Sequence, residues 1–443
     1  MNSSVKTYEF PDGEIQRVQV VHPGRWEDLE FFRPAPSEAA LACFARIYRK
    51  FLVPACPWLF GQMVLFRLPS GCSLDLPTDT GYGSVNDRLI AAAALLQKEL
   101  HLVGGTPRFR TERAQALWTE LKQKNCLQIV CGKLPFTTVI PVADAAGYLS
   151  ASEAALAVNA SFFIMDRFDC ATVYDRVGTP FGLLVKDGIV EQPPLYRREA
   201  LIVRKDGSTA IETPDVRALT LRIGGQRFRH GESCTIYTRP ERSHTPMGRG
   251  LRIVVSGNRV AAVCRGGRVP IPASGFVIVP REDCAVQPGE AVAFAGMEDV
   301  SFGIQVGGSA VRSGIPTDHF LSRFYNIRKL ERVPFPPSLY PLHFDRDRAA
   351  RIALGADADG SPVLLWAEGA AKAGHKPGQD SRGATLSDMA RYCMDAGMVN
   401  AVNLDGGGSA QLLLNGRRAL KISDRRDDGT ESERPVPLAL IVK

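Results

Sequence analysis

Short apolar runs separated by glycine-containing turns dominate the chain from residue 126 onward. Runs of five to seven apolar residues recur there, as in residues 252–263, and this spacing predicts strands. Pairs such as Asp187-Gly188, Asp206-Gly207, Asp359-Gly360 and Asn415-Gly416 provide the turns that short hairpins favour. This pattern predicts a β-rich body over residues 126–443.

The first 125 residues have a different pattern. Apolar residues stand at helical spacing in Ser37 to Leu52, Val85 to Leu102 and Arg110 to Asn125. We therefore expect an α+β protein with two parts: a helix-rich domain or cap over residues 1–125, and a mixed-sheet body with few helices over residues 126–443.

One strong helix interrupts the predicted strands. Thr385 is a candidate N-cap, and Asp388 stands three residues later, where a capping box requires an acceptor. Leu386, Met389, Ala390 and Cys393 share one face, and Gly397 fits the end of the helix. The helix is expected to lead directly into the next strand.

Composition and charge narrow the range of partners. The chain has 443 residues, is 45% hydrophobic and 23% charged, and carries a formal net charge of +7, which suits anionic small molecules without requiring nucleic acid. The apolar run at residues 51–66 is short and contains prolines, which argues against a membrane span. Residues 1–20 show no pattern of a secretory signal, so a cytoplasmic location is expected. The oligomeric state is left open.

The most distinctive stretch runs from Ala401 to Leu414. An apolar run leads to Asp405, then to Gly406, Gly407, Gly408 and Ser409, and a second apolar run follows. A hairpin needs one glycine pair, so three glycines indicate a close approach to the backbone, and their N–H groups can surround an anion. A purely structural alternative is that they let two strands and a helix pack closely.

A second glycine-containing segment, residues 355–360, has a simpler interpretation. It resembles part of a calcium loop but lacks the downstream glutamate, and it lacks the lysine of a phosphate loop. A hairpin turn is the favoured prediction.

These residues resemble the signature of the phosphodiester glycosidase family. The resemblance rests on residues 383–386, the helix, residues 400–409 and Asn415-Gly416, with weaker pieces in matching order at residues 157–163, 180–188, 236–250, 302–314, 351–355 and 367–369. It extends over about residues 126–443. Ala160, Ser161, Ile352, Glu368 and Ala370 depart from the family pattern.

The resemblance implies hydrolysis of a sugar-1-phosphodiester at the glycosidic bond, which releases a free sugar and a phosphomonoester. Because the second ionisation of a phosphomonoester lies near pH ~6, the leaving group needs little protonation. A site of this kind needs an anion cradle, an arginine and a carboxylate. The substrate is expected to be a small intracellular molecule.

Each part has a candidate in the sequence. We expect the phosphate to be held by Gly406, Gly407, Gly408 and Ser409 and to pair with Arg351. Asp405 is expected to act at the sugar carbon or on its water. Asn159 is expected to orient the sugar or the phosphate. Glu368 is the best second carboxylate, or else a surface residue. No cofactor is required, although Asp405 could hold a divalent cation instead. A non-catalytic sugar-phosphate or polysaccharide-binding protein is the alternative.

Overall fold

A seven-stranded sheet lies at the centre of the computed structural model. The structure describes residues 1–34, 62–66, 99–103, 106–123, 127–131, 154–164, 172, 174, 178–180, 182–195, 198–239, 241–317, 348–369, 375–423, 430–431 and 433–443. In spatial order the strands of the central sheet are β1 (Asn2–Glu9), β2 (Ile15–His22), β24 (Pro362–Ala367), β23 (Arg351–Asp357), β25 (Met398–Asn403), β21 (Ser309–Arg312) and β22 (Ile315–Pro316).

Two further sheets stand beside the central one. A five-stranded sheet contains β10 (Ile189–Gln192), β9 (Leu184–Lys186), β20 (Val300–Gln305), β11 (Ala200–Arg204) and β12 (Thr209–Glu212). A four-stranded sheet contains β26 (Leu412–Leu414), β8 (Leu156–Asn159), β27 (Ala439–Val442) and β3 (Glu30–Phe32). All strand pairs that the structure describes are antiparallel, so the prediction of mixed sheets is wrong for this part of the chain.

The middle strands of the central sheet, β23 and β24, are buried on both faces, which explains why their sequences are continuous apolar runs, whereas the edge strands β1 and β22 are exposed. Ile352, Leu354 and Trp366 pack against residues of the five-stranded and four-stranded sheets in one large core. On the other face, Ala353 and Leu365 pack under helix α6 (Leu386–Asp395). Strand ends in the middle of this sheet are therefore enclosed from both sides.

Helix α6 has the ends that were predicted. The Thr385 side chain accepts from the Asp388 N–H, and the Asp388 carboxylate accepts from the Thr385 N–H, which completes the capping box. Gly397 follows the helix with φ of +78°, a conformation that glycine adopts readily. Since β25 begins at Met398, the helix leads directly into the strand that precedes Asp405.

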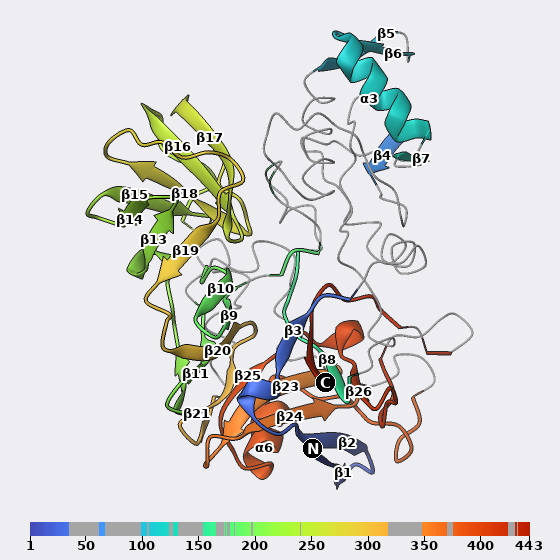
Figure 1. Ribbon diagram of the computed structural model, residues 1–443. Helices are drawn as coiled ribbons and strands as arrows, with labels where there is room; N and C mark the ends of the chain where they lie inside the picture. Colours follow the sequence, from blue (N-terminus) through green and yellow to red (C-terminus); the bar gives the residue numbers. More distant parts are fainter. Residues whose placement is uncertain are drawn as a thin grey trace.

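A separate group of strands forms a lobe beside the body (Figure 1). It contains a three-stranded sheet, β14 (Gln226–Arg229), β13 (Thr220–Ile223) and β19 (Val292–Ala295). A four-stranded sheet completes it: β15 (Cys234–Thr238), β18 (Gly275–Pro280), β16 (Gly248–Ser256) and β17 (Arg259–Gly267). A short 3-10 helix, η3 (Val216–Ala218), precedes β13.

A helix-rich cap over residues 1–125 was predicted, but residues 1–34, the longest described part of this segment, form strands and one short 3-10 helix instead. β1 and β2 belong to the central sheet and β3 to the four-stranded sheet, with η1 (Trp26–Asp28) between them. The predicted helix over residues 37–52, and most of the one over 85–102, lie outside the described residues; the end of the latter is β5 (Leu100–Val103), which pairs with β6 (Thr106–Phe109). The third helix is confirmed as α3 (Glu112–Gln123), and β4 (Gln62–Phe66) pairs with β7 (Leu127–Cys131).

The predicted turns are present. Asp187-Gly188 and Asn415-Gly416 have positive φ at both residues, as a two-residue hairpin requires. Residues 355–360 form the end of β23 and a hairpin turn, in which the Asp357 carboxylate accepts from the N–H groups of Asp359 and Ser361. Within the described residues, neither helix is long and apolar enough to cross a membrane.

Candidate functional site

The candidate site lies where three neighbouring strands of the central sheet have their ends. Arg351 begins β23, Glu368 follows β24, and Asp405 follows β25 by two residues. Arg351 stands opposite Ala367 in the β23–β24 register, and the Leu404 N–H donates to the Ile352 carbonyl at 2.8 Å. Antiparallel pairing therefore brings residues from distant parts of the chain to one edge of the sheet.

Asp405 is buried and held from two sheets. Its N–H donates to the Ala160 carbonyl at 3.1 Å, and its carbonyl accepts from the Asn159 amide at 2.7 Å. The Ser409 hydroxyl and the Gly406 N–H both bind the Asp405 carboxylate. The main chain of Asp405 is thus fixed by β8 and the residue that follows it, and its carboxylate is fixed by its own loop.

Burial raises the pKa of Asp405 to about 6. The cause is the loss of water around a charged carboxylate, which outweighs the opposing effects of the Ser409 hydrogen bond and of the charges on Arg434 and Arg351. A carboxyl group with such a pKa can change its protonation state near neutral pH. Groups of this kind are common at catalytic sites.

The glycine loop uses most of its N–H groups inside the protein. Besides the Gly406 N–H, which binds Asp405, the Gly407 N–H donates to the Ala350 carbonyl at 2.8 Å and the Ser409 N–H to the Gly406 carbonyl at 3.2 Å. Residues Gly407–Ser409 form a 3-10 turn, η5. The loop is therefore folded around the carboxylate of Asp405. The predicted phosphate contacts of Gly406, Gly407, Gly408 and Ser409 remain a prediction, and the internal hydrogen bonds of the loop argue against them.

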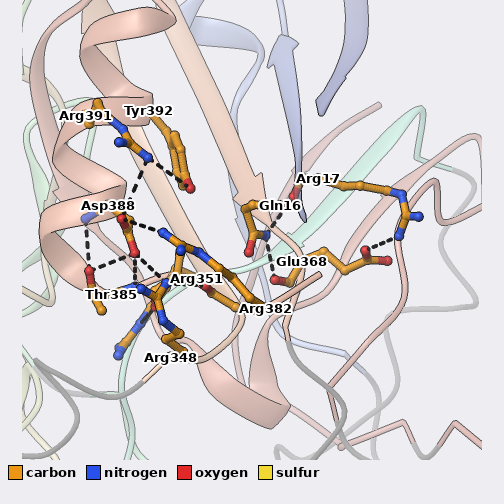
Figure 2. A network of polar contacts seen from close by, with 12 residues as sticks. Gln16, Arg17, Arg348, Arg351, Glu368, Arg382, Thr385, Asp388, Arg391 and Tyr392 are labelled. Carbon is orange, nitrogen blue, oxygen red and sulfur yellow. Dashed lines mark hydrogen bonds and ion pairs between the residues drawn. The ribbon is translucent and has the colours of Figure 1, made fainter. Parts of the chain in front are cut away.

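Arg351 is buried and lies beside the loop. A Cβ added at Gly406 would stand 3.5 Å from the Arg351 Cδ and 2.9 Å from the Ala350 carbonyl oxygen, so glycine is needed there for close approach. The Arg351 Nε donates to the Ala384 carbonyl at 3.3 Å. Figure 2 shows Arg351 next to Arg348 and Arg382 at the start of α6.

Three arginines near Arg351 lie around the Asp388 carboxylate: Arg348, Arg382 and Arg391. Arg348 contacts Asp388 at 3.0 Å, and Arg382 lies 3.6 Å from it. Arg391 lies 3.8 Å from the same carboxylate. Because three guanidinium groups share this one described carboxylate, this end of the site has a positive potential that favours anions.

Glu368 is buried, which answers one of the questions the sequence left open: it is not a surface residue. Its Oε2 accepts from the Arg17 guanidinium at 3.0 Å and from the Ser381 hydroxyl at 2.6 Å, and its Oε1 accepts from the Lys421 N–H at 2.7 Å. All three neighbours donate hydrogen bonds. This arrangement suits a carboxylate that accepts, and not a carboxylic acid that donates a proton.

Asn159 bridges two segments of backbone. Its Nδ2 donates to the Asp405 carbonyl at 2.7 Å, and its Oδ1 accepts from the Gln411 N–H at 2.9 Å. Both ends of the amide are thus engaged on either side of the glycine loop. Its observed role is to fix this loop, and its predicted contact with substrate remains a prediction.

The sequence analysis missed Arg17, Ser381 and Gln411. Gln411 is buried and binds the Arg434 carbonyl through Nε2 at 2.8 Å. Arg17 lies in a segment that mixes polar and apolar residues, so the sequence contained no distinct signal for it; the structure buries Gln16 and Gln19 of the same strand. Within the described part of the chain, no group of three or more His, Cys, Asp or Glu side chains is arranged to hold a metal ion.

Comparison with known proteins identifies the family of this site. Residues 250–443 match the family model described as phosphodiester glycosidase. The chain is 41% identical over 80 residues to human N-acetylglucosamine-1-phosphodiester alpha-N-acetylglucosaminidase, and 41% identical to the bovine enzyme of that name. Each of these matches covers 18% of this chain and 14% of the mammalian enzyme.

Residues 250–443 thus match the phosphodiester glycosidase family, which confirms the predicted resemblance for this segment; residues 126–249, over which the resemblance was also expected, lie outside the match. The curated relatives are matched over only 14% of their own length, so the match concerns this segment and not a whole enzyme. Arg351, Glu368 and the loop from Asp405 to Ser409 lie inside the matched segment, whereas Asn159 and Arg17 lie outside it.

Two solved structures align with nearly the whole chain at low similarity. A hypothetical protein from Synechocystis has a TM-score of 0.41 and 16% identity, with 99% of this chain and 61% of that chain covered. The catalytic domain of zebrafish N-acetylglucosamine-1-phosphodiester alpha-N-acetylglucosaminidase, auto-inhibited by its pro-peptide, has a TM-score of 0.34 and 13% identity, with 100% and 82% covered.

Proposed function

We propose that this protein hydrolyses a sugar-1-phosphodiester at the glycosidic bond and releases a free sugar and a phosphomonoester. The observation that carries the proposal is the buried carboxyl group of Asp405, whose pKa is about 6 and which lies within electrostatic reach of Arg351. The family match over residues 250–443 supports the same class of reaction.

Asp405 supplies the base or the nucleophile. With a pKa of about 6 it is about nine-tenths ionised at pH 7, so the form that can accept a proton from water or attack the anomeric carbon predominates. The leaving phosphomonoester has a second pKa of about 6 and needs little help from an acid. One carboxylate and nearby guanidinium groups are therefore sufficient for hydrolysis of the glycosidic bond.

Arg351 is the cation expected to meet the phosphoryl group. Its guanidinium is charged at any physiological pH and can form two parallel hydrogen bonds to phosphate oxygens. The nearby Arg348 and Arg382 add to the same positive potential. In this proposal the glycine loop orients Asp405, and most of the phosphate binding comes from Arg351.

A panel of sugar-1-phosphodiesters that differ in sugar and aglycone tests the proposal. We expect at least one member to yield free sugar and phosphomonoester in equal amounts, detected by chromatography and by phosphorus NMR. Neutral aryl glycosides of the same sugar are the control, and they should react slowly because they lack the anion that Arg351 would bind.

The same panel tests the alternative function. A protein that only binds sugar phosphates or polysaccharides would show saturable binding by calorimetry with no product, even after long incubation. That result would replace the hydrolase proposal with the binding one.

A further inference from the structure

We propose that Arg17 is a positioning residue for the site: it holds the Glu368 carboxylate in place to accept a hydrogen bond from a hydroxyl group of the sugar. This inference rests on the proposed function and extends it to a strand outside the family match. Arg17 belongs to β2, far from residues 250–443 in the sequence.

Arg17 contacts Glu368 through both main chain and side chain. The Glu368 N–H donates to the Arg17 carbonyl at 3.0 Å, and the Arg17 Nη1 donates to Glu368 Oε2 at 3.0 Å. The second guanidinium nitrogen, Nη2, donates to the Gln379 carbonyl at 2.7 Å. The guanidinium fork thus spans two elements, which the single ammonium group of a lysine would not reproduce.

Ser381 closes a ring between the two residues. Its hydroxyl accepts from the Arg17 N–H at 3.0 Å and donates to Glu368 Oε2 at 2.6 Å. Figure 2 shows Arg17 and Gln16 on one strand, both aimed at Glu368; the Gln16 amide donates to the Glu368 carbonyl at 2.8 Å. The N-terminal hairpin therefore fixes Glu368 in backbone and side chain together.

The Glu368 carboxylate keeps capacity for one more donor. A carboxylate has about four acceptor positions, and the described residues supply three donors, two at Oε2 and one at Oε1. A sugar hydroxyl is a donor of the right kind for the remaining position at Oε1. The phosphodiester group, which is ionised and can only accept hydrogen bonds at neutral pH, is not.

Glu368 is also linked to the catalytic loop by packing. A Cβ added at Gly369 would lie 2.8 Å from the Ala350 nitrogen, and one at Gly406 would lie 2.9 Å from the Ala350 oxygen. The segment after Glu368 and the loop after Asp405 therefore both pack closely against Ala350. A displacement of Glu368 should in turn displace the Asp405 loop.

The test is a double-mutant cycle on kcat and KM with the full-length protein. We expect Arg17→Gln to reduce kcat/KM for the sugar-1-phosphodiester by about tenfold, as for coupled residues in contact. Glu368→Gln should reduce it as well, and Arg17→Gln should have no further effect in that background. Guanidinium ion at millimolar concentration should partly restore Arg17→Ala.

A matched control separates positioning from loss of stability. Arg217 forms a comparably half-buried ion pair with Asp215 in the lobe, so Arg217→Gln should lower the unfolding temperature without changing kcat/KM. Additive effects of Arg17→Gln and Glu368→Gln on kcat/KM, or an active Arg17→Gln protein with unchanged constants, would overturn the inference. If the wild type turns over no member of the panel, the proposed function fails first and this inference fails with it.

Discussion

The Asn159 amide donates to the main-chain carbonyl of Asp405 at 2.7 Å, and this contact ties the four-stranded sheet to the candidate catalytic loop. We expect Asn159→Ala to lower the free energy of unfolding by about 2–4 kcal/mol, because two buried backbone groups lose their partner. It should also lower kcat by about tenfold or more, since the carboxylate is no longer held in place.

Asn400 provides the control for this substitution. It is a buried asparagine that also bridges two segments, from Thr209 to the Ser313 N–H, away from the loop. Asn400→Ala should destabilise the fold to a similar extent in urea and leave kcat unchanged. An equal loss of kcat in both variants would show that Asn159 acts on stability alone.

Ser409 donates to the Asp405 carboxylate and so keeps the pKa of that group lower than burial alone would make it. Ser409→Ala should therefore raise this pKa further. Because the base must be ionised to act, the rising limb of the kcat/KM profile should move to higher pH, with activity recovering above the new pKa. The measurement is a pH–rate profile from about pH 4.5 to 9, a range that brackets the titration of Asp405.

Ser274→Ala is the control, since Ser274 is a buried hydroxyl in the lobe that contacts Ser256. Its profile should overlay that of the wild type. A limb that stays in place or moves to lower pH in Ser409→Ala would contradict the role given to Ser409.

The raised pKa of Asp405 also has a consequence for stability. The folded pKa, about 6, lies above the reference value of 3.8, so the folded state binds the proton more tightly than the unfolded state does. The stabilising contribution of this protonation is complete below pH ~4 and is lost as the pH rises through 6. A shift of this size corresponds to a free energy on the order of 3 kcal/mol.

Asp405→Asn, which carries no charge, should therefore be more stable than the wild type at pH 8. The difference in the free energy of unfolding should shrink as the pH falls towards 4. Denaturant titrations at several pH values measure this difference. A variant that is less stable than the wild type at pH 8 would mean that the Asp405 charge is well compensated in the fold.

Two glycines of the loop differ in what they tolerate. At Gly406 an added Cβ would stand 2.9 Å from the Ala350 oxygen, whereas at Gly407 it would meet open space but a φ of +60°. Gly407→Ala should cost about 1 kcal/mol through backbone strain. Gly406→Ala should cost more, about 1–3 kcal/mol, and reduce kcat, because the loop must move. The measurements are the free energy of unfolding and kcat of both variants. Equal losses in Gly406→Ala and Gly407→Ala would contradict a role for the close approach of Gly406 to Ala350.

Local signals in the sequence were sufficient for the turns and for helix α6. The Thr385–Asp388 capping box and the Asp187-Gly188 pair involve residues within a few positions of each other, so the pattern contains the whole physical cause. The resemblance to the family likewise rested mainly on one contiguous block, residues 400–409.

Contacts between distant residues could not be predicted in the same way. Arg17 and Glu368 are 351 residues apart, and only the pairing of β2 with β24 brings them together. The Gly407 N–H was expected to face a phosphate, but it donates to the carbonyl of Ala350, the residue before β23. A glycine-rich sequence shows that the backbone is approached closely, without showing by what.

Turnover of a sugar-1-phosphodiester by Asp405→Asn, compared with the wild type at pH 7 in matched, folded preparations, tests the central claim most directly. We predict that the wild type releases free sugar and phosphomonoester, while the variant binds the same substrate and releases neither. Product formation by the variant at close to the wild-type rate would contradict the catalytic role of Asp405.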